Sequence, residues 1–139
     1  MNNNTEEDIR VEKDINGEDK YIFDPFNPLN IEITESDILN VLKRYGINYN
    51  IHNFTLYKRA FIHRSYLKRP DLENANNNIT IVNKPDNCLP LHTKCNERLE
   101  FVGDGVLECI TKYYLYKRFP KENEGFMTEK KIALVKNES

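Results

Sequence analysis

The sequence lacks several features that define large classes of proteins. Its 139 residues contain no apolar run of about 18 residues, so no segment predicts a membrane span. The N-terminus is polar and acidic, without the basic start and apolar stretch of a secretory leader. Three cysteines are too few, and odd in number, for a disulfide-stapled module. We therefore expect an intracellular protein of the cytoplasm, or alternatively of the nucleus, that contacts no membrane.

The charges nearly balance, with 20 Lys+Arg against 22 Asp+Glu, but they are unevenly distributed. Residues 1–19 hold seven acids and two bases, a net charge of -5, while the remaining 120 residues hold 15 acids and 18 bases, a net charge of +3. This mildly basic body permits a polyanionic partner without indicating one.

The composition divides the chain into a polar start and a helical body. Residues 1–20 are poor in aromatics and rich in Asn, Glu and Asp, which predicts a disordered acidic tail. Residues 21–33 carry two prolines and predict an extended strap. Residues 34–139 then predict an all-α domain, interrupted at 67–95 by a long insertion rich in Pro and Asn.

Four segments of this body have the spacing of apolar residues expected of helices: about 35–45, 54–63, 97–118 and 129–139. Thr34 can cap the first helix and Thr128 the last. The third helix would be about 33 Å long, and Pro120 would end it. We expect its buried side to consist of Leu99, Val102, Val106, Leu107 and Ile110. The last helix meets no stop signal, so we expect the domain to be incomplete at its C-terminal side.

Four acids share one side of the predicted 97–118 helix, namely Glu97, Glu100, Asp104 and Glu108. Like charges one turn apart repel by a few tenths of a kcal/mol. Either water screens this repulsion, as on an ordinary acidic surface, or a hard divalent cation binds there. Glycines flank Asp104 on both sides, and each costs about 1 kcal/mol in a helix relative to Ala. Such glycines indicate the close approach of another backbone, which favours the cation.

Residues 96–107, NERLEFVGDGVL, resemble the signature segment of the ribonuclease III family, N-E-x-L-E-F-L-G-D-A/S-V-L. Residues 60–66, AFIHRSY, resemble the A-L-T-H-R-S-Y segment of that family, and residues 115–135 resemble its L-Y-x-x-F-P…E-G-x-L-T-x-x-R-x-x-L-V continuation. The three segments occur in the family's order and cover about residues 35–139. We therefore expect residues 34–139 to be a ribonuclease III-like domain.

The resemblance implies an all-α endonuclease domain that acts as a homodimer on double-stranded RNA. It implies hydrolysis assisted by Mg²⁺, or by Mn²⁺, leaving 5'-phosphate and 3'-hydroxyl ends. The residues that match functional positions of the family are Glu100 and Asp104 as catalytic, metal-binding carboxylates, Glu97 and Glu124 as auxiliary acids, and Phe101 as a dimer contact. His63 is interpreted as a packed or capping histidine. Arg64, Lys130 and Lys131 are candidates for RNA backbone contacts or, equally, ordinary surface bases.

The chain also departs from the family. The family has a second acidic pair on a later helix and commonly a double-stranded-RNA-binding domain, and the 139 residues include neither, so we expect this chain alone to be weakly active or inactive. Two alternatives remain open: a non-catalytic ribonuclease III-like module that binds RNA or scaffolds a partner, and an unrelated helical domain with an acidic face. A zinc site is a weaker prediction, because the Cys-x3-His-x2-Cys spacing within the insertion is not a standard one.

Overall fold

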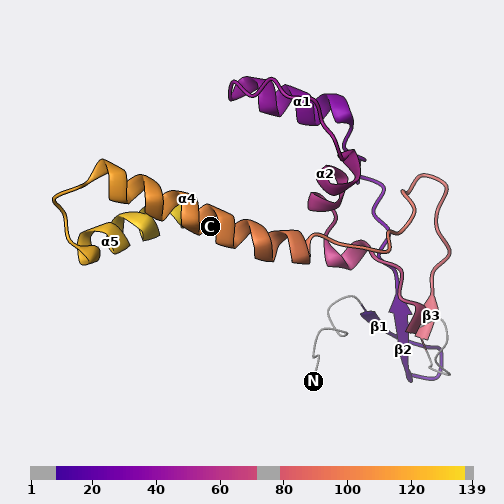
Figure 1. Cartoon of the computed structure of the whole chain (residues 1–139). Helices are drawn as coiled ribbons and strands as arrows, with labels where there is room; N and C mark the ends of the chain where they lie inside the picture. The colour runs from indigo at the N-terminus through magenta and orange to yellow at the C-terminus, as the bar shows by residue number, and fades with distance from the viewer. Residues whose placement is uncertain (1–8, 72–78, 137–139) are drawn as a thin grey trace. The chain divides into compact units, whose positions relative to one another are not determined.

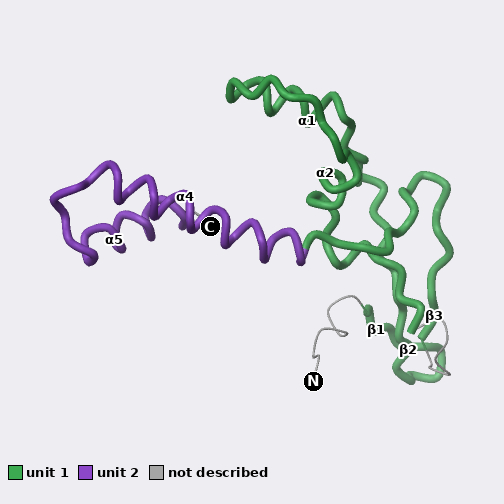
Figure 2. Tube along the Cα trace, in the orientation of Figure 1, with its two compact units in different colours: residues 1–96 green, residues 97–139 purple. Residues whose placement is uncertain are grey.

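The computed structural model describes residues 9–71 and 79–136. The chain forms two compact units, Met1–Asn96 and Glu97–Ser139 (Figure 1 and Figure 2). The first unit contains a small sheet and short helices, and the second contains two longer helices. No helix among the described residues is long and apolar enough to cross a membrane.

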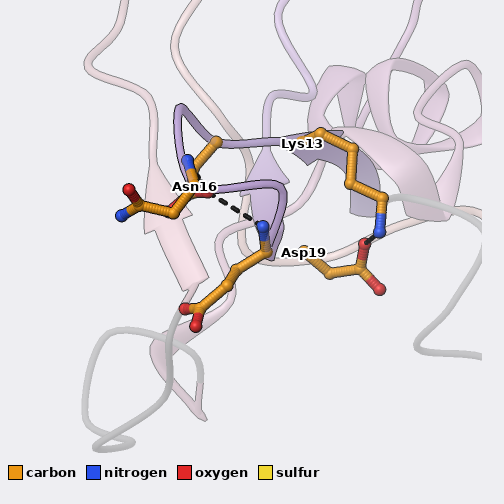
Figure 3. A network of polar contacts seen from close by, with 5 residues as sticks. Lys13, Asn16 and Asp19 are labelled. Atoms are coloured by element: carbon orange, nitrogen blue, oxygen red, sulfur yellow. Dashed lines mark hydrogen bonds and ion pairs between the residues drawn. The ribbon is translucent and has the colours of Figure 1, made fainter.

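The first unit begins with a β-hairpin. Strand β1 (Ile9–Lys13) pairs antiparallel with strand β2 (Asp19–Phe23). The side chain of Asp14 accepts hydrogen bonds from the backbone N–H groups of Asn16 and Glu18, at 2.8 and 2.9 Å, and Gly17 adopts a φ of 82° in the turn. Figure 3 shows the ion pair between Lys13 and Asp19 that joins the strand ends. The turn is therefore stabilised by its own side chains.

This hairpin corrects the prediction of a disordered tail over residues 1–20. Residues 9–20 are polar, but strand pairing and the Asp14 turn satisfy their backbone groups. Asn16-Gly17 is a strong sequence signal for a hairpin turn, and it could have revealed the strands. Residues 1–8 lie outside the described residues.

Strand β3 (Ile79–Ile81) extends the sheet by pairing parallel with β2, in the order β1-β2-β3. Ile22 and Phe23 of β2 are buried. The all-α prediction is therefore wrong as a description of the whole chain, because a three-stranded sheet accompanies the helices. The sheet was missed because β3 is three residues long and lies in the Pro- and Asn-rich insertion predicted over 67–95, of which residues 72–78 are outside the described residues.

The strap after β2 is held against the rest of the first unit by specific contacts. Phe26 packs edge-on against Tyr66, with ring centroids 6.3 Å apart. The Tyr66 hydroxyl donates a hydrogen bond of 2.8 Å to the Leu89 carbonyl. Glu32 forms an ion pair with Lys58, which lowers the pKa of Glu32 below its ordinary value. These contacts tie residues 26–32 to segments that follow much later in the chain.

Helix α1 (Glu35–Arg44) confirms the first helix prediction. The Thr34 hydroxyl accepts a hydrogen bond from the Asp37 N–H at 3.2 Å, and the Asp37 carboxylate accepts from the Thr34 N–H at 2.9 Å. The Thr34 hydroxyl also donates a hydrogen bond of 2.6 Å to the Asp37 carboxylate, and this bond, followed by the bond from the Thr34 N–H, lowers the pKa of Asp37. Helix α2 (Phe54–Ala60) is shorter than the predicted 54–63, and a short 3₁₀-helix, η1 (Arg64–Tyr66), follows it.

The second unit is a helical hairpin. Helix α4 (Glu97–Arg118) has the predicted bounds. Helix α5 (Glu124–Val135) begins five residues before the predicted position, because the side chain of Asn123 caps it by accepting from the Phe126 N–H at 3.0 Å. Thr128 therefore lies inside the helix. Of the predicted helical residues 136–139, Lys136 follows the helix, and 137–139 lie outside the described residues.

Helix α5 does not cover the predicted side of α4. Thr111 and Leu115 are the buried residues of α4, with Leu115 only 2% exposed. At 100° per residue, these two positions lie on the same side of the helix as the acids. None of the five residues predicted to be buried is buried: Leu99 is half-buried, and Val102, Val106, Leu107 and Ile110 are exposed. All of them except Leu107 lie on other sides of the helix. The spacing of apolar residues thus predicted the helix correctly and its packed side wrongly.

Candidate functional site

The acidic side of α4 exists as predicted. Because α4 is regular from Glu97 to Arg118, its four acids fall within about 80° of one another around the helix axis. Glu100 and Asp104 are separated by four residues, which corresponds to about 6 Å along the axis. The helix thus presents these two carboxylates side by side from a rigid element.

Glu100 and Asp104 are both exposed, as is Glu97 one turn before them. Within residues 9–71 and 79–136, neither Glu100 nor Asp104 forms a hydrogen bond or an ion pair through its side chain. Their mutual repulsion is therefore not offset by a neighbouring base. Two unpaired carboxylates one turn apart are suited to accept a cation.

Glu108, the fourth acid, is in a different environment. Its Oε1 atom lies 3.1 Å from the Lys112 ammonium of the same helix and 3.2 Å from the Lys131 ammonium of α5. Hydrogen bonds from Lys112 and then Lys131 lower the pKa of Glu108 below its ordinary value of 4.5. Lys131, predicted as an RNA backbone contact, is thus already bound to a carboxylate.

Glu124 lies away from Glu100 and Asp104 within this unit. It is the first residue of α5 and lines a cavity of about 500 Å³ that Lys112, Tyr116 and Lys131 also line. Tyr116 follows Asp104 by 12 residues on α4, or about 18 Å along the axis. The structure therefore does not bring Glu124 together with the acid pair of its own chain.

The remaining predicted residues are spread over both units. Phe101 is 83% exposed on α4. The ammonium of Lys130 lies 5.2 Å from the centroid of the Phe126 ring on α5. Arg64 is half-buried in η1 of the first unit. The Nδ1 atom of His63 accepts a hydrogen bond from the Ser65 N–H at 3.2 Å, which confirms the interpretation of His63 as a capping histidine.

The donor chemistry of Glu100 and Asp104 fits Mg²⁺ or Mn²⁺, which prefer carboxylate oxygens. These acids provide two ligands, however, since no group of three or more His, Cys, Asp or Glu side chains in the described ranges could hold a metal ion. The same finding contradicts the zinc prediction for Asp86, Cys88, His92 and Cys95. In the described part of the chain, no atom lies within 4 Å of a side chain added at Gly103 or Gly105, so the predicted close approach is also absent.

Sequence reasoning placed Glu108 on the acidic side but missed its partners. The pairing with Lys112 spans four residues of one helix and could have been read from the sequence. The pairing with Lys131 spans 23 residues and depends on how α5 packs against α4.

Comparisons with known proteins converge on one family. Residues 97–139 match the family described as the ribonuclease III domain. The chain is 33% identical over 123 residues to a probable ribonuclease 3 of Acanthamoeba polyphaga mimivirus, covering 87% of this chain and 22% of the relative. It is 36% identical over 97 residues to ribonuclease 3 of Enterococcus faecalis, covering 70% of this chain and 34% of the relative. It is 35% identical over 90 residues to ribonuclease 3 of Listeria monocytogenes, covering 65% of this chain and 31% of the relative.

The chain thus spans about a third or less of the length of these relatives. No solved structure matches it. The family match covers α4 and α5, the two helices that carry the acidic side and the lysines bound to Glu108. The comparisons therefore show that this chain is related to the ribonuclease III family, most directly through residues 97–139.

Proposed function

We propose that this chain is part of an endoribonuclease that cleaves double-stranded RNA with the help of Mg²⁺, or of Mn²⁺, and leaves 5'-phosphate and 3'-hydroxyl ends. The observation that carries the proposal is the pair Glu100 and Asp104. Both are exposed and unpaired among the described residues, and both lie within the region that matches the family. The relatives named ribonuclease 3 support the same reaction class.

In this proposal Glu100 and Asp104 hold the cation. When bound, the cation neutralises charge that develops on the attacking and leaving oxygens of the phosphodiester. The chain's own contribution is to fix the spacing of the two carboxylates on a regular helix, so that their oxygens need little rearrangement to bind. Glu97, one turn earlier on the same side, acts as an auxiliary acid. No side-chain nucleophile is required.

Double-stranded RNA is recognised mainly through its shape and its backbone. Arg64 and Lys130 are candidates for contacts with RNA phosphates. Lys130 is the better candidate of the two lysines on α5, because its ammonium lies over the Phe126 ring whereas Lys131 is bound to Glu108. Lys131 would have to leave that carboxylate in order to contact RNA.

We propose further that the chain works as a homodimer through Phe101. An aromatic ring that is 83% exposed beside the acid pair is suited to pack against a second copy. Glu124 shares a cavity with Lys112 and Tyr116, which follow Asp104 by 8 and 12 residues on α4, so in this proposal a second copy supplies Glu124 to the acid pair. Sedimentation should report a dimer that Phe101→Ala converts to monomer, and a monomeric parent chain would contradict the proposal.

Two carboxylates are few for cations that prefer six or more oxygens. The resemblance assigns further ligands to an acidic pair on a later helix, so we propose that these 139 residues alone cleave weakly or not at all. The experiment compares cleavage of a long RNA duplex by the 139-residue chain and by a chain extended through such a helix. Strong cleavage by the short chain would show that the second pair is not needed.

In the extended chain, Asp104→Asn should lower the cleavage rate by about a hundredfold or more, because one preorganised charge interaction is commonly worth this much in the transition state. RNA binding, measured by gel shift without divalent ions, should remain. Glu129→Gln makes a similar charge change on α5 and should cleave normally. Undiminished turnover by Asp104→Asn would remove Asp104 from the site.

A second candidate function is a non-catalytic module that binds RNA or scaffolds a partner. It is favoured by the lack of a three-residue metal-binding group in the described ranges. Such a module would bind RNA without any dependence on Asp104 or Mg²⁺, and the extended chain would not cleave. The cleavage assay on the extended chain therefore separates the two functions, whereas both predict that Asp104→Asn still binds RNA in the gel shift.

A further inference from the structure

The acidic side of α4 ends in a cluster of opposite charge. Glu108 lies one turn after Asp104, about 6 Å along the helix axis. Its carboxylate is bound by the ammonium groups of Lys112 and Lys131, at 3.1 and 3.2 Å. Two ammonium groups and one carboxylate leave a net charge of +1 beside the acid pair. We refer to Glu108, Lys112 and Lys131 as the charge cluster.

Packing of α5 creates this cluster. Helix α5 covers the side of α4 that holds Thr111 and Leu115, and this side continues directly into the acidic side. Lys131 is the least exposed member, with 25% of its side chain accessible, against 45% for Glu108 and 62% for Lys112. The neighbouring Lys130 lies over the Phe126 ring instead, so one of two adjacent lysines is directed to the end of the acid row.

We propose that Glu108 is a positioning residue that holds Lys112 and Lys131 beside Asp104, and that the net charge of this cluster sets the affinity of Glu100 and Asp104 for a divalent cation. The inference rests on the metal site of the proposed function. In this inference Glu108 acts through the lysines and not as a metal ligand, since both ammonium groups share its Oε1 atom. Each change in the charge of the cluster should move the cation affinity in a direction that its sign predicts.

The experiment measures Mn²⁺ binding to the 139-residue chain by the paramagnetic resonance signal of the free ion at low salt. Glu108→Gln leaves two unpaired lysines and should weaken Mn²⁺ binding by about fivefold, an effect typical of one unit charge at this distance in partly screened surroundings. Lys131→Met removes one positive charge and should tighten binding by about the same factor. Lys112→Met/Lys131→Met should tighten it further.

The double variant Glu108→Gln/Lys131→Met tests positioning against direct ligation. Its cluster charge is again +1, so Mn²⁺ affinity should return to within about twofold of the parent chain. If Glu108 were a ligand, this variant would still bind more weakly than the parent chain by well over twofold, because a ligand is lost as well as a charge, and that result would overturn the inference. Glu129→Gln is the matched control on α5 and should bind within about twofold of the parent.

Misfolding cannot imitate this pattern, because a disordered variant would not bind Mn²⁺ more tightly. Suppose that the parent chain binds Mn²⁺, but that Glu108→Gln and Lys131→Met either leave its affinity unchanged or both shift it in the same direction. The inference is then overturned, and the proposed metal site stands. If neither the parent nor Lys112→Met/Lys131→Met binds Mn²⁺, or if Asp104→Asn binds as well as the parent, the proposed metal site fails and the inference fails with it.

Discussion

The two halves of helix α4 have the same backbone structure and opposite surroundings. In the first half, residues 97–107, Glu100 and Asp104 have no side-chain partner among the described residues, and Phe101 is exposed. In the second half, residues 108–118, helix α5 packs over Leu115 and supplies Lys131 to Glu108. The comparison shows that a local pair with Lys112 and the packing of α5 together neutralise Glu108, whereas Glu100 and Asp104, which have neither kind of partner among the described residues, are left open to a ligand.

The largest expected effect is the loss of stability when a buried apolar side chain of α4 is shortened. Leu115 is 2% exposed and Ile110 is 61% exposed on the same helix. Leu115→Ala should lower the free energy of unfolding by about 3 kcal/mol, because it removes buried methyl groups and leaves a cavity. Ile110→Ala should change it by less than about 0.5 kcal/mol. Urea unfolding followed by circular dichroism measures both, and similar losses for the two variants would show that both sides of α4 are packed in solution.

A smaller effect should appear in the pH dependence of stability. Because the pKa of Glu108 in the folded chain is below its ordinary value of 4.5, the charged form contributes stability that is complete above the unfolded-state pKa. This contribution is lost as the pH falls through the folded-state pKa. The parent chain should therefore melt at a higher temperature than Glu108→Gln near pH 7, and the difference should vanish at a pH below 4.5 at which Glu108 is protonated in the folded chain as well.

Salt provides the control for that measurement, since about 1 M NaCl should shrink the difference near pH 7 by screening the pairs with Lys112 and Lys131. A difference in melting temperature that persists at low pH would indicate that Glu108 stabilises α5 through packing and not through its charge.

The smallest expected change in stability is at Asp104. Without divalent ions, Asp104→Asn should raise the free energy of unfolding by about 0.3 kcal/mol, because it relieves repulsion from acids one turn away on α4. Added Mg²⁺ should then raise the melting temperature of the parent chain but not of Asp104→Asn. If Asp104→Asn destabilised the chain, Asp104 would have a structural partner, and the contrast between the two halves of α4 would weaken.

Local signals in the sequence were sufficient for several elements. Thr34, as a capping residue, predicted the start of α1, and Pro120 predicted the end of α4. The segment NERLEFVGDGVL identified the family and the row of acids. Where two local signals competed, the prediction failed: Asn123 and Thr128 both suit a helix N-terminus, and the structure uses Asn123. Periodicity could not separate them, because a helix pattern is the same from either start.

By itself, the sequence determined the existence and bounds of α4 and the alignment of Glu100 and Asp104 on one side of it, because helix geometry depends only on local backbone dihedrals and spacing. Only the tertiary structure decided which side of α4 is buried and that Glu108 gains Lys131 as a partner in addition to Lys112 of its own helix. Leu115 is covered and Glu108 is bound by Lys131 because α5 folds back over that side. Such contacts join residues distant in the sequence, and their energies depend on burial and partners that no local pattern contains.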